Sequence, residues 1–168
     1  MAYILDANIF IQAKNLHYSF DFCPAFWDWL ILSNQARQVF SIEKVGDELE
    51  AGDDELSQWA AARGAAFFLK PDPLLIPALG RVSNWAANQH YDPAAVSTFL
   101  QVADYYLVAH ALAHGDTLVT HEVPTDTRKK IKIPNVCIGL GIKCMSPYEM
   151  LRRERALFVL GSRTSPSA

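Results

Sequence analysis

The stretch MAYILDANIF, residues 1–10, places an ionisable side chain, Asp6, in a run of otherwise apolar residues. Such a run is typical of a buried β-strand, and Asn8 is the other polar residue within it. Burying an isolated carboxylate costs roughly several kcal/mol unless it is paired, hydrogen-bonded or neutralised. Asp6 is therefore either a local capping residue or the partner of a cation.

Outward from this stretch, short apolar runs alternate along the chain with segments of helical periodicity. This alternation predicts a three-layer α/β/α fold, with a central, mostly parallel twisted sheet flanked by helices. The predicted strands are 2–5, 38–42, 65–69, 117–120 and 136–140. The predicted helices are 23–34, 43–52, 54–64, 72–90, 96–114 and 146–158.

The composition is that of one folded globular domain. The 168 residues are 51% hydrophobic, and we expect a single domain over residues 1–160 with a disordered tail over 161–168. No apolar run approaches the roughly 20 residues that cross a bilayer. The three cysteines form no CxxC pair, and the N-terminus lacks the features of a signal peptide. We therefore expect a cytoplasmic protein without membrane contact.

Asp104 is a second acid in apolar surroundings. On a helix over 96–114, its neighbours four residues before and four after are Leu100 and Val108, which indicates the core-facing side. Glu122 directly follows a predicted strand, and Glu48 lies on the predicted helix 43–52. Each of these glutamates alone is typical of an exposed acid.

Together, the four acids predict a metal site. Asp6 and Glu122 follow strands and the other two lie on flanking helices, so a parallel sheet can bring them into one cleft. Clustered carboxylates repel one another, and a bound divalent cation reverses this effect. Oxygen-only ligand sets favour Mg²⁺ or Mn²⁺, which bind phosphate oxygens and orient an attacking water.

These motifs resemble the PIN-domain ribonucleases, which include the VapC-like toxins of toxin–antitoxin pairs. The resemblance spans roughly residues 3–151 and rests on YILDANIFI, VGDEL, ADYYLVAHALAHG and LVTHE. It implies a PIN fold, metal-dependent endonucleolytic cleavage of RNA and a cognate antitoxin protein, and it is compatible with a homodimer. It places the catalytic and metal-binding acids at Asp6, Glu48, Asp104 and Glu122.

The fourth motif departs from the family pattern. His121 and Glu122 stand where the family usually shows Asn and Asp, so Asp126 is an alternative fourth acid. The segment between residues 52 and 92 is also longer than in compact family toxins.

Supporting roles are open for several neighbouring side chains. Asn8 is either a positioning group for Asp6 or a turn former, and Thr120 is either a hydrogen-bond donor to a ligand carboxylate or an ordinary strand residue. A basic run follows Glu122 and is either a contact for RNA phosphates or a solvated loop: Arg128, Lys129 and Lys130. The net charge of −3 gives no global sign of nucleic-acid binding.

Other functions remain as alternatives. A haloacid dehalogenase-type phosphatase needs a second Asp two positions after the first, where this chain has Asn8. A receiver-type phosphoacceptor needs paired acids at the end of the first strand. The stronger alternative is a catalytically impaired PIN-like module that binds RNA or a protein.

Overall fold

The computed structural model describes residues 1–161 of the chain. The predicted disordered tail, 161–168, lies outside the described residues apart from Gly161. Within residues 1–161, no helix has the length and apolar character needed to cross a membrane.

A five-stranded sheet forms the centre of the protein, and every pairing in it is parallel. The strand order is β3-β2-β1-β4-β5. The strands are β1 (Tyr3–Leu5), β2 (Val39–Ile42), β3 (Phe68–Leu69), β4 (Thr117–Val119) and β5 (Cys144–Met145). The predicted α/β fold with a mostly parallel sheet is therefore confirmed.

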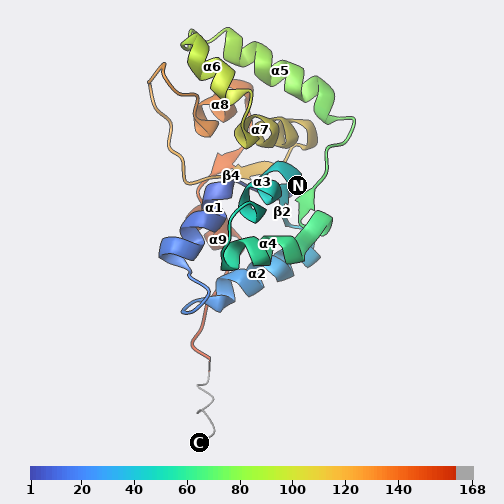
Figure 1. The fold of residues 1–168 in the computed structure, drawn as a ribbon, viewed down its shortest axis with the longest axis vertical. Coiled ribbons are helices and arrows are strands. Elements are labelled where there is room, and N and C mark those ends of the chain that lie inside the picture. Colours follow the sequence, from blue (N-terminus) through green and yellow to red (C-terminus); the bar gives the residue numbers. More distant parts are fainter. Residues whose placement is uncertain (162–168) are drawn as a thin grey trace, which may run out of the picture.

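Helices cover both faces of this sheet (Figure 1). On one face lie α5 (Leu75–Ala87), α6 (Pro93–Phe99), α7 (Ala103–His114) and α8 (Ile133–Leu140). On the other lie α1 (Ala7–Gln12), α2 (Pro24–Gln35), α4 (Glu55–Arg63) and α9 (Pro147–Arg153). The helix α3 (Glu43–Glu50) contacts both α4 and α7. Short helical turns at Ala13–His17 and Gly64–Ala66 complete the described elements.

The strand order places the reversal of the sheet between β1 and β4. The chain runs outward from β1 through β2 to β3, then crosses to the other side of β1 to form β4 and β5. In open parallel sheets, ligands bind outside the carboxyl ends of the strands at such a reversal. The residues that follow Leu5 and Val119 therefore occupy the position where a site is expected.

Two of the predicted elements are wrong. Residues 136–140, predicted as a strand, belong to the helix α8, and the last strand is instead Cys144–Met145. Short apolar runs do not distinguish a strand from a buried helix by periodicity alone, and Pro134 in the first turn favours the helix. The predicted helix over 96–114 is broken because Val102 has an extended backbone (φ −104°, ψ 166°) between α6 and α7.

The strand predicted over residues 2–5 is confirmed, and the apolar run that follows it is helical. The strand ends at Leu5, and the chain turns directly into α1 after Asp6. The apolar residues beyond Asp6 are still buried, because Ile9 and Phe10 face the core from a helix. Asp6 therefore lies at a strand-to-helix junction, directly after the strand as predicted.

Candidate active site

Asp6 is buried at the reversal point of the sheet and has no cationic partner within residues 1–161. It is only 6% exposed, and its backbone N–H donates to the Val119 carbonyl at 3.0 Å. Its carboxylate makes no side-chain capping hydrogen bond to α1 and no ion pair within residues 1–161. The side chain of Asp6 makes no capping hydrogen bond, although the N–H of Ala7 lowers its pKa, and residues 1–161 supply no cation that pairs with it.

A hydrogen-bond network built on Thr120 positions the Asp6 carboxylate. The Thr120 hydroxyl donates to Oδ2 of Asp6 at 2.7 Å. The same hydroxyl oxygen accepts from Nδ2 of Asn8 at 3.2 Å and from the backbone N–H of Glu122 at 3.0 Å. Oδ1 of Asn8 in turn accepts from the backbone N–H of His121 at 3.2 Å. Asn8 therefore acts on Asp6 through Thr120.

The surroundings of Asp6 disfavour its negative charge. Burial is the main cause that raises the pKa of its carboxyl to about 7. The hydrogen bond from Thr120 lowers this pKa, whereas the charges of Asp104 and Glu122 raise it. Two of the predicted acids therefore lie near enough to Asp6 to oppose its ionisation.

Asp104 lies in the first turn of α7, where the break after α6 places it. It is partly buried, and burial raises the pKa of its carboxyl to about 6. The charges of Glu122 and Glu48 raise this pKa further, and the charge of Lys130 lowers it. The structure thus brings the four acids of the sequence motifs into electrostatic contact through Asp104.

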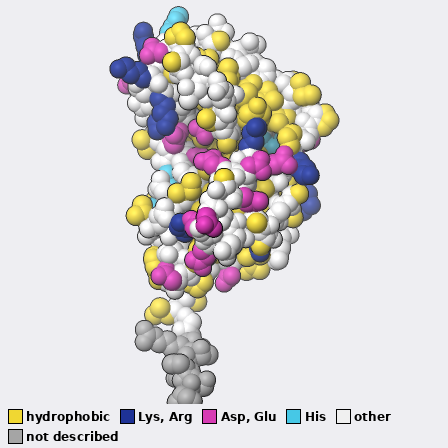
Figure 2. Space-filling view, viewed as in Figure 1, with side chains coloured by type: hydrophobic (Ala, Val, Ile, Leu, Met, Phe, Trp, Pro, Cys, Tyr) yellow, Lys and Arg dark blue, Asp and Glu magenta, His cyan; other side chains and the backbone are white. Residues whose placement is uncertain are grey.

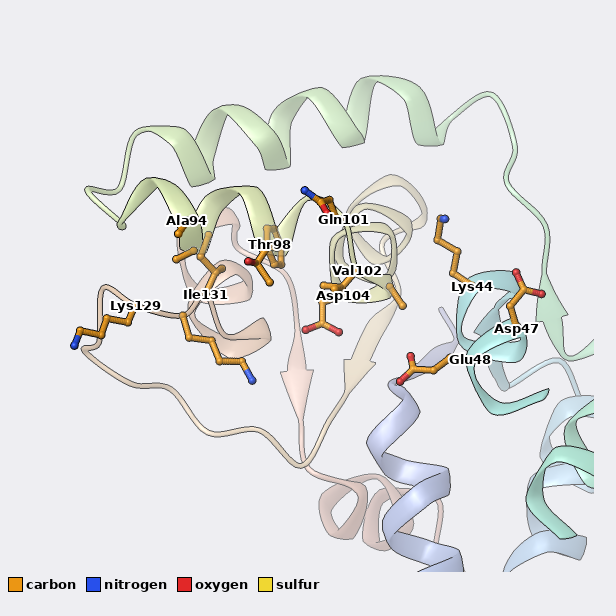
Figure 3. Close-up of a pocket in the computed structure, with 14 residues that line it drawn as sticks. Lys44, Asp47, Glu48, Ala94, Thr98, Gln101, Val102, Asp104, Lys129 and Ile131 are labelled. Atoms are coloured by element: carbon orange, nitrogen blue, oxygen red, sulfur yellow. The ribbon is translucent and has the colours of Figure 1, made fainter. Parts of the chain in front are cut away.

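Glu48 approaches the same region from α3, where its side chain is exposed. In Figure 3 the carboxylates of Glu48 and Asp104 point toward the same space, and that of the adjacent Asp47 points away. Figure 2 shows acidic side chains gathered across the middle of this face of the molecule.

Glu122 is engaged by the protein itself. Its Oε2 accepts from the backbone N–H of Ile133 at 2.8 Å, at the first turn of α8. Its Oε1 lies 3.2 Å from Nζ of Lys132 and 4.0 Å from Nζ of Lys130. Glu122 therefore holds the start of α8, in addition to contributing negative charge beside Asp6.

A cavity of about 730 Å³ opens between α3, α6, α7 and the loop before α8. Asp104 and Glu48 line it, together with Lys44, Lys129 and Lys130. The cavity thus combines acids with flexible cations that can contact phosphate oxygens. Asp126 and Arg128 are exposed on the same loop and do not line this cavity.

The donor chemistry of these acids fits a hard divalent cation. Within residues 1–161, no group of three or more His, Cys, Asp or Glu side chains is arranged to hold a metal ion by itself. Mg²⁺ does not require such a cage, because one or two carboxylates, waters and substrate phosphates suffice. Asp6 and Asp104, whose charges repel each other, have the carboxylate chemistry of such a pair.

The sequence motifs did not indicate two of the basic residues. Lys44 lies over the ring of Tyr106 at 4.3 Å from its centroid, on the wall of the cavity. It lies four residues before Glu48 on α3. This spacing places both side chains on the same face of the helix, and it could have indicated Lys44 from the sequence. Lys132 ends the basic run 128–132, but its contact with Glu122 depends on the path of the loop, which the sequence does not indicate.

The fold, with its acids at the reversal of a parallel sheet, defines a PIN-like α/β protein. The chain is similar to a chain in the crystal structure of VapBC2 from Rickettsia felis, in which VapBC2 is bound to a DNA fragment from its promoter. The match has a TM-score of 0.54 and 17% sequence identity, and covers 87% of this chain and 98% of that chain. The PIN-like fold implied by the motifs is thereby confirmed.

The chain belongs to the family DUF4411, described as a domain of unknown function, whose model matches residues 3–158. A comparison with curated proteins found no match.

Proposed function

We propose that this protein is a metal-dependent endoribonuclease that hydrolyses phosphodiester bonds of RNA. The observation that carries the proposal is Asp6, a buried carboxylate with neither a cap nor an ion pair within residues 1–161. The protein keeps this carboxylate among other acids although burial raises its pKa. A cation bound there would offset the repulsion.

Asp6 and Asp104 would hold Mg²⁺ or Mn²⁺, with Glu48 facing the same space and Glu122 adding negative charge. When bound, the metal would activate a water and stabilise the leaving oxygen of an in-line displacement. The hydrogen bond from the hydroxyl of Thr120 lowers the pKa of Asp6 and would favour its ionised, metal-binding form. The ammonium groups of Lys129 and Lys130 would neutralise RNA phosphates at the rim of the cavity.

We further propose that the protein is the toxin of a toxin–antitoxin pair that acts in the cytoplasm. The likeness in fold to a chain of the VapBC2 structure supports this assignment. A cognate antitoxin would control activity by covering the acidic cavity. A homodimer is compatible with the proposal.

The proposal is tested by cleavage of a panel of structured and single-stranded RNAs, using purified antitoxin-free protein with either Mn²⁺ or EDTA. We expect cleavage only with Mn²⁺, and a loss of at least roughly a hundredfold in Asp6→Asn and Asp104→Asn. Asp47→Asn is the matched control, because Asp47 also lines the cavity and precedes Glu48 on α3, but its carboxylate points away from Asp104. Inactivity of a folded wild-type protein on every RNA would contradict the proposal.

One observation favours a second candidate, a catalytically impaired module that binds RNA or protein. Glu122 is already engaged by Lys132 and by the N–H of Ile133, which leaves fewer oxygens for a metal. In this case RNA would bind without being cut, and binding would be the same with Mn²⁺ and with EDTA. The cleavage assay and a parallel binding assay separate the two functions.

A further inference from the structure

Three partly exposed rings form a cluster beside the candidate active site: His17, His121 and Tyr148. The ring centroids of the two histidines lie 5.5 Å apart, and each lies 5.8 Å from that of Tyr148. The hydroxyl of Tyr148 and Nε2 of His17 are hydrogen-bonded at 3.1 Å. The cluster therefore joins three segments that are far apart in the sequence.

The position of the cluster is tied to that of Asp6. His121 directly follows Thr120, the residue that donates to Asp6, and its backbone N–H is held by Asn8. His17 is the last residue of a π-helical turn, Ala13–His17, that continues α1. Such turns are rare and occur frequently at functional sites. The two histidines are thus fixed to the segments that carry and position the buried acid.

The arrangement of the rings differs from that of the aromatic core. Phe20 and Trp27 stack face to face at 3.9 Å and an interplanar angle of 16°. Within the cluster, the interplanar angles are 32°, 83° and 67°, so no pair is stacked face to face. Partial exposure and tilted packing leave aromatic surface available for a further flat group.

A second cavity, of about 510 Å³, adjoins this surface. His121 and Tyr148 line it, together with Thr120 and Glu122. Its volume lies within the range of about 300–1,000 Å³ typical of small-molecule sites. It therefore lies next to the proposed cleavage site and has room for a ligand group.

The chemistry of the two cavities differs. The cavity of Asp104 contains three lysines, whereas the second is lined by neither Lys nor Arg and contains Glu122 and Glu149. Its other walls are largely apolar, and Val123 and Ile138 are each 72% exposed. A phosphate would be repelled there, whereas a nucleobase could stack on the rings and cover the apolar side chains.

We propose that His121 and Tyr148, with His17 packed against both, bind an unpaired base of single-stranded RNA beside the phosphodiester bond at Asp6. This inference rests on the proposed nuclease function and names its substrate class, RNA with a base free to leave its stack. The lysine-lined cavity would take the backbone, and the ring cluster would take the base. Duplex RNA, whose bases remain stacked in pairs, would be a poor substrate.

The test compares two probes in EDTA, where cleavage is absent. One is an unstructured RNA of roughly 12 nucleotides, and the other is the same backbone with abasic riboses. Both are labelled with a fluorophore, and anisotropy gives their affinities for the full chain. We expect His121→Ala and His17→Ala to weaken binding of the RNA roughly tenfold and to leave the abasic probe unchanged.

Two further variants control for folding and for the loss of a histidine as such. His121→Phe keeps a ring at the position, so it should restore most of the RNA affinity. His90→Asn changes an exposed histidine that lines neither cavity and should bind like the wild-type protein.

If His121→Ala weakens binding of both probes equally, or of neither probe, the proposed base-binding site is wrong. This conclusion holds whether or not the protein cleaves RNA. A wild-type protein that discriminates the probes through His121 but does not cleave RNA with Mn²⁺ would contradict the nuclease function alone. The two proposals can therefore fail separately.

Discussion

Thr120 and Asp6, which are 114 residues apart in the sequence, are joined by a hydrogen bond of 2.7 Å from the hydroxyl to the carboxylate. A hydroxyl has one proton and two acceptor sites. Both acceptor sites of Thr120 are taken, by Asn8 and by the backbone N–H of Glu122. The proton of Thr120 is therefore directed at Asp6, which stabilises the ionised carboxylate.

Replacing Thr120 by Val removes this donor and keeps the side-chain shape. A hydrogen bond to a charged group contributes about 1.5–3 kcal/mol, so the pKa of Asp6 should rise by about one unit or more. The pH at which Mn²⁺-dependent cleavage reaches half its maximum should rise by a similar amount. Thr120→Ser retains the hydroxyl and should follow the wild-type profile. Superimposable profiles for wild type and Thr120→Val would contradict this role.

The metal-free protein should lose stability as the pH rises from about 4 to 7. Burial raises the pKa of Asp6 to about 7 and that of Asp104 to about 6, both above the ordinary value of 3.8. The folded state then binds more protons than the unfolded state across this interval, so the free energy of unfolding falls as the pH rises and levels off above it. The loss should be on the order of a few kcal/mol.

Urea unfolding in EDTA at several pH values measures this dependence. Asp6→Asn should be more stable than the wild-type protein at pH 8 and should show a flatter profile. Asp126→Asn, which changes an exposed acid of the same region, should retain the wild-type slope. A wild-type stability that increases from pH 5 to 8 would be the opposite of the expected result.

Adding Mn²⁺ at pH 8 should raise the melting temperature of the wild-type protein. A ligand at roughly 100 times its Kd adds about 2.7 kcal/mol to the free energy of unfolding. Asp6→Asn and Asp104→Asn should lose most of the shift. Asp47→Asn should retain it, because Asp47 lines the cavity but its carboxylate points away from Asp104. Equal shifts in all four proteins would indicate metal binding elsewhere.

Removing one of the lysines that line the cavity of Asp104 should weaken RNA binding. It should also make the RNA affinity less dependent on the salt concentration. Each phosphate contact contributes a slope of about −0.7 to the plot of log affinity against log salt for single strands. Lys130→Ala should reduce the slope by about this amount. Lys143→Ala, which removes an exposed lysine whose Nζ contacts Sδ of Met1, is the control. An unchanged slope in Lys130→Ala would exclude a phosphate contact.

The contact between α5 and α8 should depend on Gly139. A Cβ atom at this position would overlap the indole ring of Trp85 on α5. Gly139→Ala should therefore lower the free energy of unfolding by about 1–3 kcal/mol. Gly80→Ala, on α5 itself, meets no atom within 4 Å and should be neutral or stabilise by up to about 1 kcal/mol. Chemical denaturation of both variants checks the difference, and equal stabilities would contradict close packing at Gly139.

The sequence by itself was sufficient for the fold class and for the placement of the acids on their elements. Alternating apolar runs and helical segments predicted the parallel sheet. Asp6 follows a strand, Glu122 lies just beyond one, and Glu48 and Asp104 lie on helices, as predicted. These features depend on local periodicity and on the cost of burying a carboxylate, both of which are visible in a short window of sequence.

Only the tertiary structure decided how these residues meet. The run 136–140 is helical although its apolar residues suit a strand, because short runs of this kind take their conformation from their packing. Glu122 contacts Ile133, and Thr120 contacts Asp6, because the order of the strands and the path of the loop bring them together. A hydrogen bond between residues 114 positions apart has no local signature, since it depends on which strands become neighbours.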